Sequence, residues 1–206
     1  MANDIGLFEA MYTCRAMRRI KPDPVPPDVL KELIAAANQA PTASNQQHAR
    51  WIVVRDVAVK KALADINRAA IVRNYGTAAT APPDPRAERG RSAFLWQAEH
   101  MEEIPALVVA CLEFASPPVD TFVSGAGAGG SIWPAVQNLL LAARGLGLGA
   151  VPTTLPLADR TAAKTALELP AHVEPFCVIP VGYPMGRFGP VSRRPLDEVM
   201  RWDRWA

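Results

Sequence analysis

The chain has 206 residues, of which 50 % are hydrophobic and 20 % are charged, and its formal net charge at neutral pH is +2. This composition excludes a disordered chain and predicts a single domain, residues 1–206, with a large buried core. The charges are nearly balanced and form no dense Lys/Arg run, which argues against nucleic-acid binding.

The cysteines and the apolar segments exclude further classes. Three Cys residues lie far apart, without a C-x-x-C or Cys/His pattern, so neither a disulfide framework nor a metal site is expected. Such cysteines suit a reducing compartment, and no apolar leader is visible, so we expect a cytoplasmic protein. The most apolar stretch, residues 132–157, is broken by Arg144, glycines and prolines, and predicts a core element and no membrane span.

Hydrophobic periodicity predicts helices and strands that alternate along the chain. Helical spacing is found over residues 5–11, 27–39, 57–72, 91–102, 131–146 and 161–169, with Ser131 as a candidate N-cap. Short apolar runs predict strands at residues 51–54, 104–114, 150–155 and 175–182. Residues 75–89 contain three prolines and are predicted to be a loop, either a functional lid or disordered. The tail, residues 195–205, carries two tryptophans, which need a surface to pack against.

Two segments have the composition of a ligand site. Residues 40–47 connect a predicted helix to a predicted strand, and their small hydroxyl and amide side chains can contact a polar ligand. An ordinary polar loop with local turns is the alternative. Arg15, Arg18 and Arg19 fall within five residues, and guanidinium groups bind phosphate oxygens in pairs. A solvated basic turn, or pairing with surface carboxylates, explains these arginines equally well.

A glycine-rich segment, residues 125–130, formally matches the G-x-G-x-x-G pattern of dinucleotide-binding proteins. That pattern requires a strand immediately before it and an acidic residue about 20 residues later. The predicted strand ends well before the glycines, and residues 145–158 contain no acid. A Rossmann dehydrogenase is therefore disfavoured, and the glycines more simply let a loop approach a ligand or a second subunit.

Several landmarks occur in one order along the chain. They are Arg15-x-x-Arg18, Ala40-Pro41-Thr42 with Asn45 and Gln47, Pro134-x-x-Gln137-Asn138, Gly145-Leu146-Gly147, Pro180-x-Gly182-Tyr183 and Arg193-Arg194-Pro195. Their order and spacing, over residues 8–199, resemble the nitroreductase family of FMN-dependent flavoenzymes. The resemblance implies an α+β fold in which helices flank a mixed, mostly antiparallel sheet. It also implies an intertwined homodimer with two FMN sites at the interface.

The resemblance further implies which residues bind the cofactor. The segment around the flavin phosphate corresponds to Arg15, Ala16, Met17 and Arg18, together with Arg193 and, more weakly, Arg194. The loop on the ribityl chain and ring corresponds to Pro41, Thr42, Asn45 and Gln47. The segment against the isoalloxazine corresponds to Pro152, Thr153, Thr154 and Leu155. No catalytic residue is expected, because the flavin carries the hydride chemistry and the protein binds, orients and tunes it.

The chain departs from the family pattern at two places. Many relatives have Arg where this chain has Cys14 and Ser where it has Ala16, which removes one cation and one hydroxyl from the phosphate site. The family often has Pro-Trp at the position of His48-Ala49, so the bulky ring is absent here. His48 is either a donor that faces the substrate or a solvated loop residue.

The activity implied by the resemblance is a ping-pong reaction with two small-molecule substrates. NADH or NADPH gives hydride to the flavin and leaves, and an electron-poor acceptor such as a nitroaromatic or a quinone then takes it up in the same pocket. Two alternatives stay open. One is different chemistry on the same scaffold, namely reductive dehalogenation, enone reduction or flavin fragmentation. The other is a flavin-binding or storage protein without reductase turnover.

Overall fold

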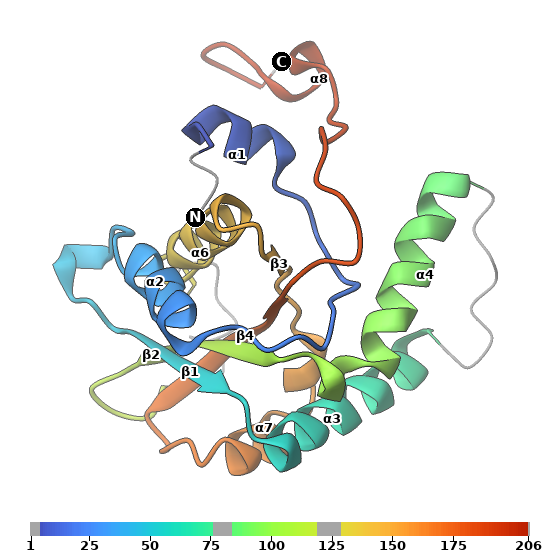
Figure 1. Ribbon diagram of the computed structural model, residues 1–206. Helices are drawn as coiled ribbons and strands as arrows, with labels where there is room; N and C mark the ends of the chain where they lie inside the picture. Colours follow the sequence, from blue (N-terminus) through green and yellow to red (C-terminus); the bar gives the residue numbers. More distant parts are fainter. Residues whose placement is uncertain (1–4, 76–83, 119–128, 206) are drawn as a thin grey trace.

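The computed structural model describes residues 5–75, 84–118 and 129–205. Most of the predicted lid at residues 75–89 and of the glycine run at residues 125–130 lies outside these ranges. The chain forms a central sheet covered by helices on both faces (Figure 1).

The sheet has four strands among the described residues: β1 (Ala49–Val54), β2 (Ala106–Glu113), β3 (Gly149–Ala150) and β4 (Val173–Gly182). Their order is β1-β2-β4-β3, and every neighbouring pair is antiparallel. The register of the three long strands is given by Val109 of β2, which lies opposite Ile52 of β1 on one side and Val178 of β4 on the other. The α+β prediction is confirmed, and the described strands show only the antiparallel part of the predicted mixed sheet.

The helices are α1 (Leu7–Thr13), α2 (Pro27–Ala37), α3 (Val57–Tyr75), α4 (Pro85–Glu99), α6 (Trp133–Gly145), α7 (Arg160–Ala166) and α8 (Leu196–Val199). Helices α2 and α6 cover one face of the sheet, where Leu33 and Leu139 pack with Val108. Helices α3 and α7 cover the other face, where Leu63 and Ala163 pack with Val109. Successive strand residues point to opposite faces, and both faces of the sheet are covered. Strand β2 is therefore apolar at nearly every position.

Three local predictions were wrong. The strand predicted at residues 150–155 is limited to Gly149–Ala150, followed by an isolated bridge at Thr153 and a 3-10 turn from Leu155. Helix α4 begins at Pro85, six residues before the predicted start at Arg91, because a proline is tolerated in the first turn of a helix. Ser131 does not cap α6, whose N-cap is Ile132. The Ser131 hydroxyl instead accepts a hydrogen bond from the backbone N–H of Ala43, at 3.1 Å.

Helix α1 and the C-terminal segment lie together at one end of the molecule, beyond α6 (Figure 1). The backbone N–H of Val191 donates to the carbonyl of Tyr12 at 3.1 Å, which ties the C-terminal segment to the end of α1. Both elements expose large apolar side chains: Phe8 is 68 % exposed, and Trp202 and Trp205 are 80 % and 86 % exposed. Arg201 lies over the Trp205 ring at 5.6 Å, but within the described chain both tail tryptophans stay largely exposed.

Candidate functional site

The segment after α1 carries the first predicted site residues and is held tightly against the sheet edge. The backbone N–H of Met17 donates to the carbonyl of Ala150 in β3, at 3.4 Å. Met17 and Ile20 are buried, and glycine is required where they pack. A Cβ at Gly149 would lie 2.7 Å from the Ile20 side chain, and one at Gly182 would lie 2.5 Å from it. With these two side chains facing the sheet, the neighbouring arginines are left to face outward.

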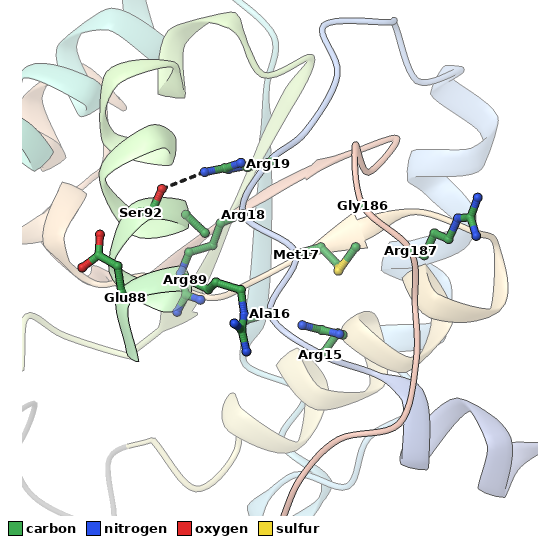
Figure 2. Close-up of a pocket in the computed structure, with 11 residues that line it drawn as sticks. Arg15, Ala16, Met17, Arg18, Arg19, Glu88, Arg89, Ser92, Gly186 and Arg187 are labelled. Atoms are coloured by element: carbon green, nitrogen blue, oxygen red, sulfur yellow. Dashed lines mark hydrogen bonds between the residues drawn. The ribbon is translucent and has the colours of Figure 1, made fainter. Parts of the chain in front are cut away.

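The outward side of this segment borders two adjoining pockets. The Arg19 pocket has a volume of about 540 Å³ and is lined by Arg15, Ala16, Met17, Arg18, Arg19, Glu88, Arg89, Ser92, Ala93, Gly186 and Arg187 (Figure 2). The Arg193 pocket has a volume of about 550 Å³ and is lined by Arg15, Ala16, Arg18, Arg89, Gly90, Ala93, Pro190, Val191, Ser192 and Arg193. Volumes of this size are typical of small-molecule sites. Arg15, Arg18 and Arg89 border both pockets.

The lining of both pockets is strongly cationic. Glu88 is the one acidic residue among the described residues that line them, and it already faces Arg91 at 3.4 Å. Within the described ranges, Arg15, Arg18 and Arg89 have neither an ion pair nor a side-chain hydrogen bond. Arg18 is half-buried, and burial lowers the pKa of its guanidinium because the charged form loses solvation. Partly desolvated guanidinium groups without a counter-charge are suited to bind an anion.

The structure brings the phosphate-site residues predicted from both ends of the sequence into these pockets. Arg15, Ala16 and Arg18 line both of them, Met17 lines the Arg19 pocket, and Arg193 lines the Arg193 pocket. Arg194 is exposed and lines neither. The Arg193 Nη1 donates to the backbone carbonyl of Ser192 at 2.9 Å.

The segment predicted to contact the isoalloxazine, residues 152–155, begins directly after β3 and Val151. It is therefore next to the point where Met17 bonds to Ala150. Thr153 and Val178 exchange backbone hydrogen bonds of 2.8 Å in both directions, which fixes this segment against β4. It lines neither arginine pocket, but it leaves the sheet edge beside them.

The loop of Pro41, Thr42, Asn45 and Gln47 lies elsewhere in the chain. Thr42 and Gln47 line a small pocket of about 190 Å³ that shares no residue with the arginine pockets. The Thr42 hydroxyl accepts a hydrogen bond from the Gln47 backbone at 3.1 Å, and the φ angles of Asn45 and Gln47 are 53° and 54°. Left-handed backbone at residues other than glycine is costly and is often found at functional sites. Within one chain, this loop and the arginines remain separate.

His48 also lies apart from the arginines. It borders a fourth pocket with Glu113 and His172, and its Nε2 atom is 3.0 Å from the Gln46 side-chain oxygen. Across the described ranges, His, Cys, Asp and Glu side chains form no group of three or more that could hold a metal ion. Nor does any helix in those ranges have the length and apolar character needed to cross a membrane.

Sequence analysis missed the contribution of α4 to the pockets. Arg89 and Ser92 both come from this helix, and Arg19 Nη2 donates to the Ser92 hydroxyl at 2.8 Å (Figure 2). The available signal was the pair Asp84-Pro85, because Asp before a helix and Pro in its first turn are typical of a helix start. From such a start, Arg89 and Ser92 are three residues apart and share a helix face.

The α+β fold with an arginine cluster beside one sheet edge is the arrangement of a protein that can bind an anionic small molecule. Comparison with known proteins gives the family. The model of the nitroreductase family matches residues 13–183, and the chain belongs to that family.

Individual relatives align with most of the chain. A protein from Thermus thermophilus named NADH dehydrogenase is 30 % identical, over 91 % of this chain and 91 % of its own length. Iodotyrosine deiodinase from Thermotoga neapolitana is 26 % identical over 94 % of this chain and 95 % of its own length. A crystal structure of an iodotyrosine deiodinase bound to FMN and 3-iodo-L-tyrosine has the same fold. It matches with a TM-score of 0.75 at 24 % identity, over 97 % of this chain and 100 % of that one.

Proposed function

We propose that the chain is an FMN-dependent oxidoreductase that uses NAD(P)H and reduces an electron-poor acceptor. The observation that carries this proposal is the Arg193 pocket, where Arg15, Arg18 and Arg193 meet although they are far apart in the sequence. A phosphate monoester with two negative charges needs several guanidinium donors, and this donor set fits it. Arg18, half-buried and without a partner in the described chain, gains the counter-charge it lacks.

Each part of the site has a distinct task in this proposal. Arg15, Arg18 and Arg193 hold the phosphate of FMN. In the segment 152–155, the backbone N–H groups of Thr154 and Leu155 are available to the flavin ring, because Pro152 has none and that of Thr153 bonds to Val178. The chemistry that bound FMN supplies is hydride transfer, from NAD(P)H to a nitroaromatic, a quinone or a similar acceptor, in a ping-pong cycle. The chain itself binds and orients, and we assign no side chain to proton transfer.

A second copy of the chain would complete the site. Thr42 and Gln47 lie in a pocket separate from the arginines, so one chain does not bring all the predicted FMN residues together. The exposed apolar side chains of α1 and of the tail provide a surface for a partner, since soluble monomers rarely expose large contiguous apolar patches. We therefore propose a homodimer in which the Thr42 loop of one protomer meets the arginines of the other.

The redox state of the cysteines is informative about the cellular compartment. All three are free, and burial raises the pKa of the Cys111 and Cys177 thiols to about 12, so both stay protonated and unreactive at neutral pH. Unpaired thiols suit a reducing compartment, and a cytoplasmic location remains our proposal.

The colour of the purified protein tests the cofactor, and its reaction with NADPH tests the activity. We expect a yellow protein that releases FMN on denaturation, bleaches with NADPH in the absence of air and regains its colour when nitrofurazone is added. A flavin that NADPH cannot bleach would indicate a storage protein. A colourless protein that cannot take up FMN would refute the proposal.

Reductive dehalogenation is the second candidate, favoured by the likeness to the Thermotoga neapolitana deiodinase over nearly the full length of both chains. The test is to offer 3-iodotyrosine in place of nitrofurazone to the reduced enzyme. Release of iodide at a rate comparable to nitrofurazone reduction would favour this candidate, and the absence of iodide would exclude it.

A further inference from the structure

The arginine pockets hold more positive charge than the phosphate of FMN requires. Arg15, Arg18 and Arg193 suffice for one phosphate at the Arg193 pocket. Arg19, Arg89 and Arg187 remain, and all three line the adjoining Arg19 pocket. Glu88 is the one acidic residue among the described residues of this pocket, and it faces Arg91, so the arginines give the pocket an excess of positive charge that favours a second anionic group.

The Arg19 pocket has donors of its own. Arg19 Nη2 is 2.8 Å from the Ser92 hydroxyl on α4, and Arg89 lies three residues earlier on the same helix. Figure 2 shows Arg19 turned toward Ser92, with Arg187 pointing away from the other labelled arginines. The donors that remain around Ser92 are thus the guanidinium groups of Arg19 and Arg89 and the Ser92 hydroxyl. Arg19, on the segment after α1, and Arg89 with Ser92, on α4, border the Arg19 pocket from two sides.

The chemistry of these donors favours a phosphate monoester. A carboxylate carries one charge and is satisfied by a single bidentate guanidinium, whereas a phosphate monoester carries nearly two charges and has three acceptor oxygens. Of the two nicotinamide donors that the proposed reaction admits, NADPH has such a group, the 2′-phosphate, and NADH does not. We propose that Arg19, Arg89 and Ser92 form a subsite for the 2′-phosphate, so that the chain prefers NADPH over NADH. This inference rests on the proposed function.

The kinetic test compares Arg19→Gln and Ser92→Ala with the parent protein, all loaded with FMN. We expect kcat/KM for NADPH to fall at least ~10-fold in Arg19→Gln and less in Ser92→Ala, because a charged donor contributes more than a neutral one. With NADH, both variants should stay within ~2-fold of the parent. Arg55→Gln is the matched control, since Arg55 is an exposed arginine that lines neither pocket. All assays use one ionic strength, because salt screens such contacts.

A binding measurement separates this inference from the proposed function. Calorimetry with adenosine 2′,5′-bisphosphate and with ADP should show at least ~10-fold tighter binding of the bisphosphate to the parent, a difference that Arg19→Gln abolishes. Inorganic phosphate is the third probe, and if it competes as strongly as the bisphosphate, the pocket binds only a free ion and the inference is wrong. A parallel loss of NADPH and NADH activity, or a loss of FMN in Arg19→Gln, would also overturn it. If the protein takes up no FMN at all, the proposed function fails, while the calorimetric difference still decides the subsite.

Discussion

Replacing Arg18 with methionine separates a ligand-binding role from a structural one. Arg18 is half-buried, borders both arginine pockets, and makes no ion pair or side-chain hydrogen bond with the described residues. Methionine keeps a long apolar stem and removes the charge, which burial already destabilises, as the lowered pKa of Arg18 indicates. The flavin-free protein should therefore unfold with a free energy within about 1 kcal/mol of the parent.

FMN binding should respond strongly to the same change. A hydrogen bond to a charged group contributes about 1.5–3 kcal/mol, so the dissociation constant for FMN should rise about 10- to 100-fold. At a free FMN concentration 100 times the parent's dissociation constant, ligand binding stabilises the parent by about 2.7 kcal/mol. A variant whose affinity is 100-fold weaker gains only about 0.4 kcal/mol at that concentration.

Two assays measure these quantities. Quenching of flavin fluorescence gives the dissociation constant of FMN, and urea unfolding with and without FMN gives the two stabilities. An Arg18→Met protein that binds FMN within twofold of the parent would refute the assignment of Arg18 to the phosphate. A loss of more than about 2 kcal/mol in the flavin-free protein would show instead that Arg18 supports the fold.

Three further predictions concern the pocket, the core and the thiols. Arg15→Ala and Arg193→Ala should each lower the FMN affinity about 10-fold or more by fluorescence titration, and unchanged flavin occupancy in both would contradict the phosphate site. Leu139→Ala removes a fully buried side chain and should cost about 2–5 kcal/mol in urea unfolding; a cost below 1 kcal/mol would mean that the site collapses without a cavity. Cys111 and Cys177 have a pKa raised from 9.0 to about 12 by burial, so the unfolded chain loses these protons first and the folded protein loses stability as pH rises from 9 toward 12. We expect a fall of roughly 1–2 kcal/mol per pH unit in urea unfolding over that range, smaller in a Cys111→Ala variant; equal slopes in the two proteins would be evidence against this cause.

The elements that sequence analysis placed well are those whose pattern is local. Strands β2 and β4 were predicted within two residues at each end, because a continuous apolar run marks a strand that is covered on both faces. The predicted start of α4 was six residues late, because the prolines before it favour a loop, although one of them belongs to the first helical turn. With that start missed, Arg89 was placed in a loop, and its position three residues before Ser92 on one helix face was not recognised.

The candidate site shows a second limit of local patterns. Composition indicated that Arg15 and Arg18 suit an anion, but Arg193 joined them only through the family resemblance, because no local signal relates residues so far apart. The separation of the Thr42 loop from the arginines was equally invisible, since it depends on how the whole chain packs. Spacing along the sequence gives the face of a helix or strand, and the packing of elements decides which faces meet.

Because Arg15 and Arg193 line the same pocket, that pocket is completed late in translation. A nascent chain folds from its N-terminal end as synthesis proceeds, so α2, α3 and the first two strands can assemble while residue 193 is still untranslated. The proposed FMN site cannot assist those early steps, because its phosphate-binding residues are complete only after Arg193 has been translated. We expect flavin capture to be a late, post-translational event, and a prematurely terminated chain without residue 193 to emerge colourless.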